Sequence, residues 1–239
     1  TPLIAGTGTS ELIFYAPSAT SGFAISGSIY ASSFTKAGAG DVTLSGDNRG
    51  TLSGPLQLSG ANWVRLNNQY AVGGNPLNPY ASGIPIYLNG GQLYSNTASL
   101  WYLSDVTLNT DSKIGGNAAM YNNLTISGYS PGSNPNNTPM VLNITNNGAA
   151  YFAGTLNVAG SASIALQNNL NVYGGLSGSG NLQVWGASGS NSTMALAGSS
   201  NYTGAKVTVE QGILSLLNGG TAASVKPLGT AAVTVNPGG

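Results

Sequence analysis

The chain has 239 residues, of which only 5% are charged, and its six basic and six acidic residues give a net charge of zero. It contains no His and no Cys, which excludes imidazole proton transfer, thiol nucleophiles, thiolate metal sites and disulfide bonds. The absence of a basic cluster argues against nucleic acid or an anionic membrane as a partner, whereas a hydrophobic content of 41% is enough for a core.

The N-terminal end, Thr1-Pro2-Leu3, has neither an initiating Met nor a charged segment followed by an apolar one. We therefore expect a mature or proteolysed fragment of something longer, whose secretion signal, if it has one, has been removed or lies outside this chain. No apolar run approaches about 18 residues, so we expect no membrane-spanning helix and no direct membrane insertion.

One short pattern recurs along the chain: an apolar residue, a small polar residue and a second apolar residue. Side chains alternate along a strand, so each triplet places two apolar side chains on one face and the polar side chain on the other. Gly, Asn or Ser follows most triplets and predicts a turn there. The triplets occupy residues 42–44, 56–58, 106–108, 124–126, 142–144, 156–158, 170–172, 182–184, 207–209, 214–216 and 233–235.

These triplets predict an all-β fold, a parallel β-solenoid of roughly ten coils with about 20–25 residues in each. Their spacing is too short for a crossover helix after every strand, and no stretch has a helical apolar stripe. The alternative is a set of antiparallel β-sandwich modules, although their strands are usually longer. In the solenoid, we expect one group of side chains to point inward and another outward. The inward group is Leu156, Val158, Leu170, Val172, Leu182 and Val184, and the outward group is Asn157, Asn171 and Gln183.

Aromatic residues gather in the first half of the chain, around a Pro-rich segment. Aromatic faces stack on sugar rings, so these residues are candidates for surface binding, although core packing is the more common role of such side chains. The candidates are Trp63, Tyr70, Tyr80, Tyr87, Tyr94 and Trp101. Segments near 73–85 and 129–139 are rich in Pro, Asn and Gly and are predicted to project as loops, where specificity often resides.

The few charged residues form only two tight groups, Asp41/Asp47/Arg49 and Asp105/Asp111/Lys113. A polysaccharide-cleaving site needs at least two carboxylates on one face. Each group is also what a turn held by an Asp–backbone hydrogen bond requires, and we favour that interpretation. We therefore predict no catalytic, cofactor-binding or metal-binding residues, and no cofactor.

The last third of the chain carries a more specific pattern. It contains Leu176-Ser-Gly-Ser-Gly-Asn-Leu182, then Asn201-Tyr-Thr-Gly204, Val207-Thr-Val209, Gly212-Ile-Leu214 and a closing Val233-Thr-Val235. These elements, in this order, resemble the autotransporter-associated β-strand repeat over about residues 174–239. A weaker copy lies near 34–66, where Leu44 and Gly46 take the places of Leu196 and Gly198, but Arg49-Gly50 stands where Tyr-Thr-Gly is expected.

The resemblance implies a right-handed parallel β-helix, secretion by a bacterium, and a role in adhesion, surface structure or extracellular assembly, as in autotransporter passengers. It does not imply an enzyme. We expect a solenoid over 1–173 that continues into the repeat at 174–239.

The expected function is therefore a non-catalytic extracellular structural or adhesive module. Its expected partners are neighbouring repeats or other copies of itself, in a filament, with glycans and host surfaces as further candidates. The alternative is a carbohydrate-binding or carbohydrate-active β-helix protein.

Overall fold

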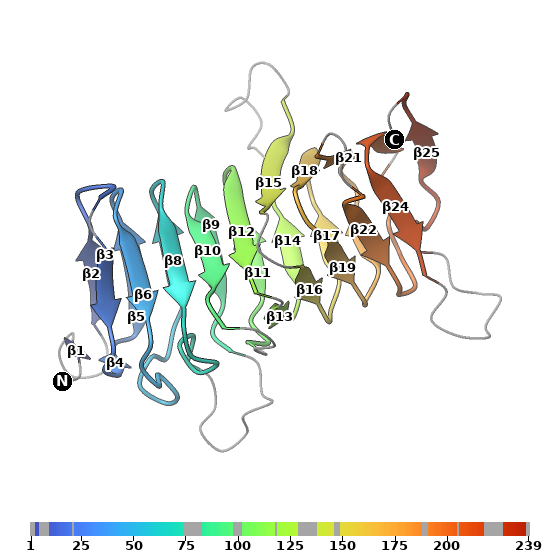
Figure 1. The fold of residues 1–239 in the computed structure, drawn as a ribbon. Helices are drawn as coiled ribbons and strands as arrows, with labels where there is room; N and C mark the ends of the chain where they lie inside the picture. The colour runs from blue at the N-terminus through green and yellow to red at the C-terminus, as the bar shows by residue number, and fades with distance from the viewer. Residues whose placement is uncertain are drawn as a thin grey trace.

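The computed structural model describes residues 3–4, 10–20, 22–73, 83–97, 102–117, 119–128, 138–145, 149–187, 191–204, 206–217 and 227–237. Within these residues the chain forms strands, turns and irregular segments and no helix, so none of them forms a helix that could cross a membrane. The strands stack side by side along one axis, with the N-terminal coils at one end and the C-terminal coils at the other (Figure 1).

Three sheets run along this axis, and a two-stranded pair, β1 (Leu3–Ile4) with β4 (Ile29–Tyr30), lies near the N-terminus. The eight-stranded sheet contains β2 (Glu11–Tyr15), β5 (Ser33–Ala37), β7 (Leu56–Ser59), β9 (Ile86–Asn89), β11 (Val106–Leu108), β14 (Leu124–Ile126), β17 (Leu156–Val158) and β20 (Leu176–Gly178). The ten-stranded sheet contains β3 (Gly22–Ile25), β6 (Asp41–Leu44), β8 (Trp63–Leu66), β10 (Gln92–Ser95), β12 (Ser112–Gly116), β15 (Met140–Ile144), β18 (Ala162–Leu166), β21 (Leu182–Gly186), β23 (Lys206–Gln211) and β25 (Ala232–Val235). The five-stranded sheet contains β13 (Ala119–Tyr121), β16 (Ala150–Phe152), β19 (Leu170–Val172), β22 (Thr193–Leu196) and β24 (Ile213–Leu216).

Consecutive coils pair in parallel register, which confirms the solenoid and excludes the antiparallel sandwich. Val42 pairs with Val64, which lies 22 residues later, and Ile164 pairs with Val184, which lies 20 residues later. The chain makes about eight turns rather than the ten expected. Two of the coils are longer than the others: Val64 pairs with Leu93 and Ile114 pairs with Ile144, at intervals of 29 and 30 residues.

The core is built from columns of side chains that repeat once per coil. Leu156, Val158, Leu170, Val172, Leu182 and Val184 are all buried, whereas Asn157, Asn171 and Gln183 are only partly covered, as the triplets predict. In the eight-stranded sheet one inward column passes through Leu56, Ile86, Val106, Leu124 and Leu156. Each apolar side chain therefore contacts its counterparts in the coils before and after it, so that burial depends on having a coil on both sides.

Aromatic rings form part of the same interior. Tyr102, Tyr121 and Phe152 stack with ring centroids 5.6 and 5.4 Å apart, and all three are buried. Burial raises the pKa of both tyrosines above its usual value. Tyr202, the aromatic residue of the Asn-Tyr-Thr-Gly pattern, is also buried, and its hydroxyl donates to the Gly180 carbonyl of the preceding coil. This pattern thus fastens one coil to the next.

Corresponding residues of the two predicted repeat copies lie in different sheets of the solenoid. Leu44 lies in β6 of the ten-stranded sheet, whereas Leu196 lies in β22 of the five-stranded sheet. The assignment of these two residues to equivalent places is therefore wrong. The reason is that the triplet has the same inward–outward alternation on every face, so it specifies burial without specifying the sheet.

Candidate binding surfaces

Of the four candidate aromatic residues that the structure describes, it brings two together. Trp63 and Tyr94 lie on the outer face of the ten-stranded sheet, with ring centroids 5.3 Å apart in an edge-to-face arrangement. Tyr70 lies in a turn, and Tyr87 lies on the outer face of the eight-stranded sheet. Tyr80 and Trp101 are outside the described residues, as are residues 74–82 and 129–137 of the two predicted loops.

The Trp63–Tyr94 pair belongs to a cluster of outward-facing side chains that interact with one another through an ion pair, a ring contact and a hydrogen bond. Arg65 forms an ion pair with Asp41 at 3.0 Å, and its guanidinium lies 4.9 Å from the centre of the Tyr94 ring. The Trp63 amide also donates to the Asp41 carboxylate. Because these groups are satisfied across three adjacent coils, the cluster has the features of a lateral staple between coils.

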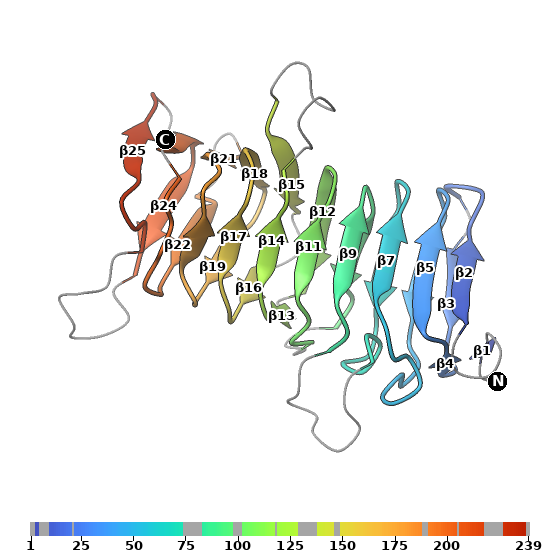
Figure 2. The same ribbon diagram turned by 180° about the vertical axis from the view of Figure 1, so that it is seen from behind.

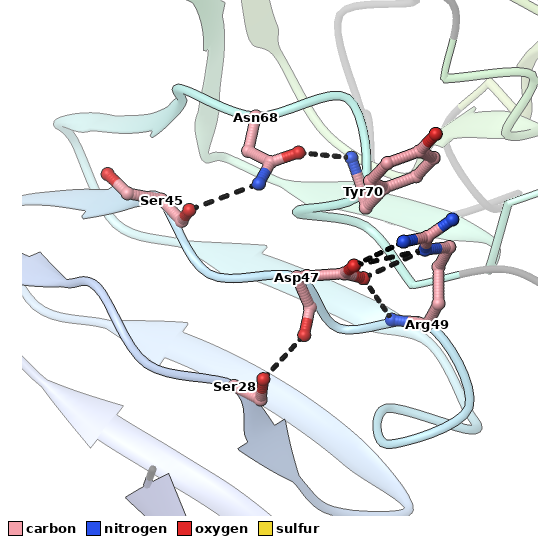
Figure 3. A network of polar contacts seen from close by, with 6 residues as sticks. All are labelled: Ser28, Ser45, Asp47, Arg49, Asn68 and Tyr70. Carbon is pink, nitrogen blue, oxygen red and sulfur yellow. Dashed lines mark hydrogen bonds and ion pairs between the residues drawn. The ribbon is translucent and has the colours of Figure 1, made fainter. Parts of the chain in front are cut away.

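Tyr70 takes part in a second staple, at a turn (Figure 3). Arg49 stacks on its ring at 3.5 Å and forms an ion pair with Asp47, whose carboxylate also accepts from the Arg49 amide. Hydrogen bonds from the Arg49 guanidinium hold the pKa of Asp47 below its usual value. Asn68 accepts from the Tyr70 amide and donates to the Ser45 carbonyl, which ties this turn to the previous coil.

Tyr87 borders an open polar groove of about 640 Å³ that runs across the outer face of the eight-stranded sheet. The floor of the groove is the outward column of that sheet, and its members are Tyr87, Thr107, Thr125, Asn157 and Ser177. One rim consists of residues that directly precede the strands: Asp105, Asn123 and Thr155. Figure 2 views the strands of this sheet from the outside, lying side by side.

The rim is fixed by hydrogen bonds from coil to coil, whereas most of the floor is unpaired. Asn123 donates through its amide to Asp105 at 2.9 Å, and its side-chain oxygen accepts from the Thr155 backbone at 2.8 Å. Within the described residues, the side chains of Thr107, Thr125 and Asn157 form no hydrogen bond with the protein. The groove therefore presents hydroxyl and amide groups that are available to a ligand.

The six carboxylates are engaged separately, each with its own partner. Beyond the pairs already described, Glu11 accepts from the Thr35 hydroxyl, Asp111 from the Val141 amide and Glu210 from the Asn236 side chain. Of these six carboxylates, Asp105 is the one among the described residues that line the groove. Among the described residues no group of three or more His, Cys, Asp or Glu side chains could hold a metal ion.

Lys36 is a buried charged residue that the charge pattern did not identify. It occupies an inward position between Phe14 and Leu58, and its ammonium donates to the carbonyls of Gly38 and Asn62 at 2.7 and 3.3 Å. Burial lowers the pKa of Lys36, an effect that nearby Asp41 partly offsets. The alternation Phe34-Thr35-Lys36 could have located it, since Lys36 holds the place of the second apolar residue.

Sequence reasoning also missed the polar groove and one exposed aromatic pair. Tyr151 and Tyr173 stack nearly parallel, with centroids 6.4 Å apart and Tyr173 well exposed. Part of the signal for the groove was present in the triplets, because three of its five floor residues, Thr107, Thr125 and Asn157, are central residues of triplets.

No family model, curated protein or solved structure matches the chain. The resemblance to the autotransporter-associated repeat therefore stays a prediction from the residues.

Proposed function

We propose that this protein is a non-catalytic structural or adhesive module of an extracellular or cell-surface bacterial protein, and that it adds end to end to further solenoid coils, including other copies of itself. The observation that carries the proposal is the opening of the hydrophobic core at both ends of the stack.

Inward positions that are fully covered in the middle of the stack become exposed at its ends. Val42 and Val207 are completely buried, but Phe23 and Val233, their partners in the terminal strands, are 41% and 48% exposed. Val235 is 61% exposed. At the C-terminal end, β25 and β24 also border an apolar pocket of about 320 Å³ lined by Val209, Leu214, Leu216 and Val233, among others. One more coil at either end would cover this surface.

The backbone of the strands at both ends can also pair with a strand of another chain. Within the described residues, β3 and β25 are the edge strands of the ten-stranded sheet. Edge strands present unpaired N–H and C=O groups that pair readily with another strand. Both edges belong to the same sheet and all its strands run parallel, so a second copy can continue it head to tail. A net charge of zero offers little electrostatic repulsion against such stacking.

The lateral surface supports a role without catalysis. Each carboxylate has its own structural partner, and the tightest charged clusters hold turns or neighbouring coils together. A hydrolytic site would need two carboxyl groups facing one substrate bond.

Sedimentation velocity and electron microscopy of the purified chain over a concentration series test the proposal. We expect concentration-dependent rods that Val235→Asp abolishes, because the variant places a charge on the exposed end. Asn143→Asp places the same charge on the lateral face and should leave the rods intact. A chain that stays monomeric at every concentration would contradict end-to-end assembly of copies.

A further inference from the structure

We infer that the groove on the eight-stranded sheet binds an extended neutral polysaccharide along the solenoid axis. This inference is independent of the proposed end-to-end assembly, because the groove lies on the lateral face and its floor belongs to the middle coils.

The length and direction of the groove suit a linear polymer. Its floor residues Tyr87, Thr107, Thr125, Asn157 and Ser177 are successive partners in one parallel ladder. Strands in a sheet are about 4.8 Å apart, so the five side chains span roughly 19 Å. Asn201 and Gly178 extend the lining at the C-terminal end. An elongated row of similar contacts at regular intervals matches a ligand that is itself a linear repeat.

The chemistry of the lining favours sugar hydroxyls. A hydroxyl both donates and accepts hydrogen bonds, and the hydroxyl and carboxamide groups of Thr and Asn offer both functions in return. At one end of the groove Tyr87 supplies an aromatic ring, whose apolar face can cover the C–H face of a sugar ring. Because the side chains of Thr107, Thr125 and Asn157 have no hydrogen-bond partner in the part of the chain that the structure describes, a ligand that binds them need not displace an internal hydrogen bond there.

The groove is poorly suited to polyanions, because of its charge, and to extended peptides, because of its paired backbone. Among the described residues that line the groove there is no Lys or Arg, and Asp105 is the one acidic residue, so a polyanion such as nucleic acid or an acidic glycan would find no counter-charge there. An extended peptide is best bound at a sheet edge through backbone hydrogen bonds. Here the backbone of each inner strand is already paired on both sides, which leaves only side chains for recognition.

The rim is built to keep its shape on binding. The carboxamide of Asn123 links Asp105 of one coil to Thr155 of another, and these bonds restrict the rotamers of the rim side chains. A pre-ordered site loses little conformational entropy when a ligand binds.

Isothermal titration calorimetry with neutral hexasaccharides tests the inference. The probes are cellohexaose, xylohexaose, mannohexaose and laminarihexaose, with hexagalacturonate as the charged comparison. We expect at least one neutral probe to bind with Kd below about 1 mM, and Asn157→Ala and Tyr87→Ala each to weaken it about tenfold. Asn143→Ala is the matched control, because Asn143 is the central residue of a Leu-Asn-Ile triplet on the ten-stranded sheet. Its affinity should stay within about twofold of the unmodified chain.

Three results would overturn the inference: no neutral probe binds, hexagalacturonate binds more tightly than every neutral probe, or Asn143→Ala weakens binding as much as Asn157→Ala. The floor side chains face solvent, so these variants keep the fold, which circular dichroism verifies. The sedimentation behaviour of Asn157→Ala should equal that of the unmodified chain, which separates this inference from the assembly proposal.

Discussion

Replacing Leu170 with Asp tests whether the stacked columns hold the solenoid together. Leu170 is completely buried in β19, between Ala150 of the coil before it and Met194 of the coil after it. Truncating a buried Leu to Ala costs about 2–5 kcal/mol, because both the transfer energy and the contacts around the new cavity are lost. Asp adds an unpaired charge at the same place, so we expect a loss of more than about 5 kcal/mol.

Urea denaturation followed by circular dichroism measures this loss, and the neighbouring residue provides the control. Asn171→Asp puts the same charge on the outward face one residue away, where Asn171 is partly exposed, and should change stability by no more than about 0.5 kcal/mol. If Leu170→Asp and Asn171→Asp unfold at the same urea concentration, Leu170 does not lie in a packed column and the assignment of inward and outward faces is refuted.

Three further predictions concern the turns, the buried tyrosine and the lateral staple. Gly175 has a φ of +87°, and a Cβ there would overlap a carbonyl oxygen of the next coil, so Gly175→Ala should lower the free energy of unfolding by more than about 1 kcal/mol. Gly22 has open space around it, so Gly22→Ala should lower it by less. Thermal melts compare the two variants. Burial raises the pKa of Tyr202 from 10.0 to about 12, so the stability that the neutral phenol contributes is complete below pH 10 and falls as the pH rises towards 12. The urea midpoint of the unmodified chain should therefore fall more over this pH range than that of Tyr202→Phe. An equal fall in both proteins would contradict this prediction. The Arg65–Asp41 pair is partly exposed, so Arg65→Ala should cost about 1 kcal/mol or less, and a larger loss on urea denaturation would show that the staple is a main source of stability.

The fold class could be predicted from the sequence because the triplets carry the burial pattern directly. Leu156-Asn157-Val158 and Leu170-Asn171-Val172 have the same alternation, and the structure buries their apolar members and leaves their Asn residues partly exposed. The sheet in which a triplet lies could not be predicted, because these two neighbouring triplets fall in the eight-stranded and the five-stranded sheets respectively.

The lateral surfaces were harder to predict because they depend on register between coils. The interval between paired residues varies from 18 to 32, so the sequence does not show that Trp63 lies beside Tyr94 or that Tyr87 precedes Thr107 in one column. The sequence analysis also gave no indication that Lys36 is buried, because a charged residue inside a core is rare and its two carbonyl partners come from separate turns.

Cross-linking of two single-cysteine proteins tests end-to-end addition most directly. If β25 of one copy pairs in parallel with β3 of the next so that the exposed inward residues Val233 and Phe23 become neighbours, Thr234 lies beside Ala24. The strand spacing is then about 4.8 Å, which a disulfide can span. The natural chain has no Cys, so no other thiol competes. We predict that a mixture of Thr234→Cys and Ala24→Cys forms a mixed disulfide dimer on mild oxidation, well above the level from Asn143→Cys with Ala24→Cys. Equal yields from the two mixtures would contradict the proposal that the open ends join copies of this protein.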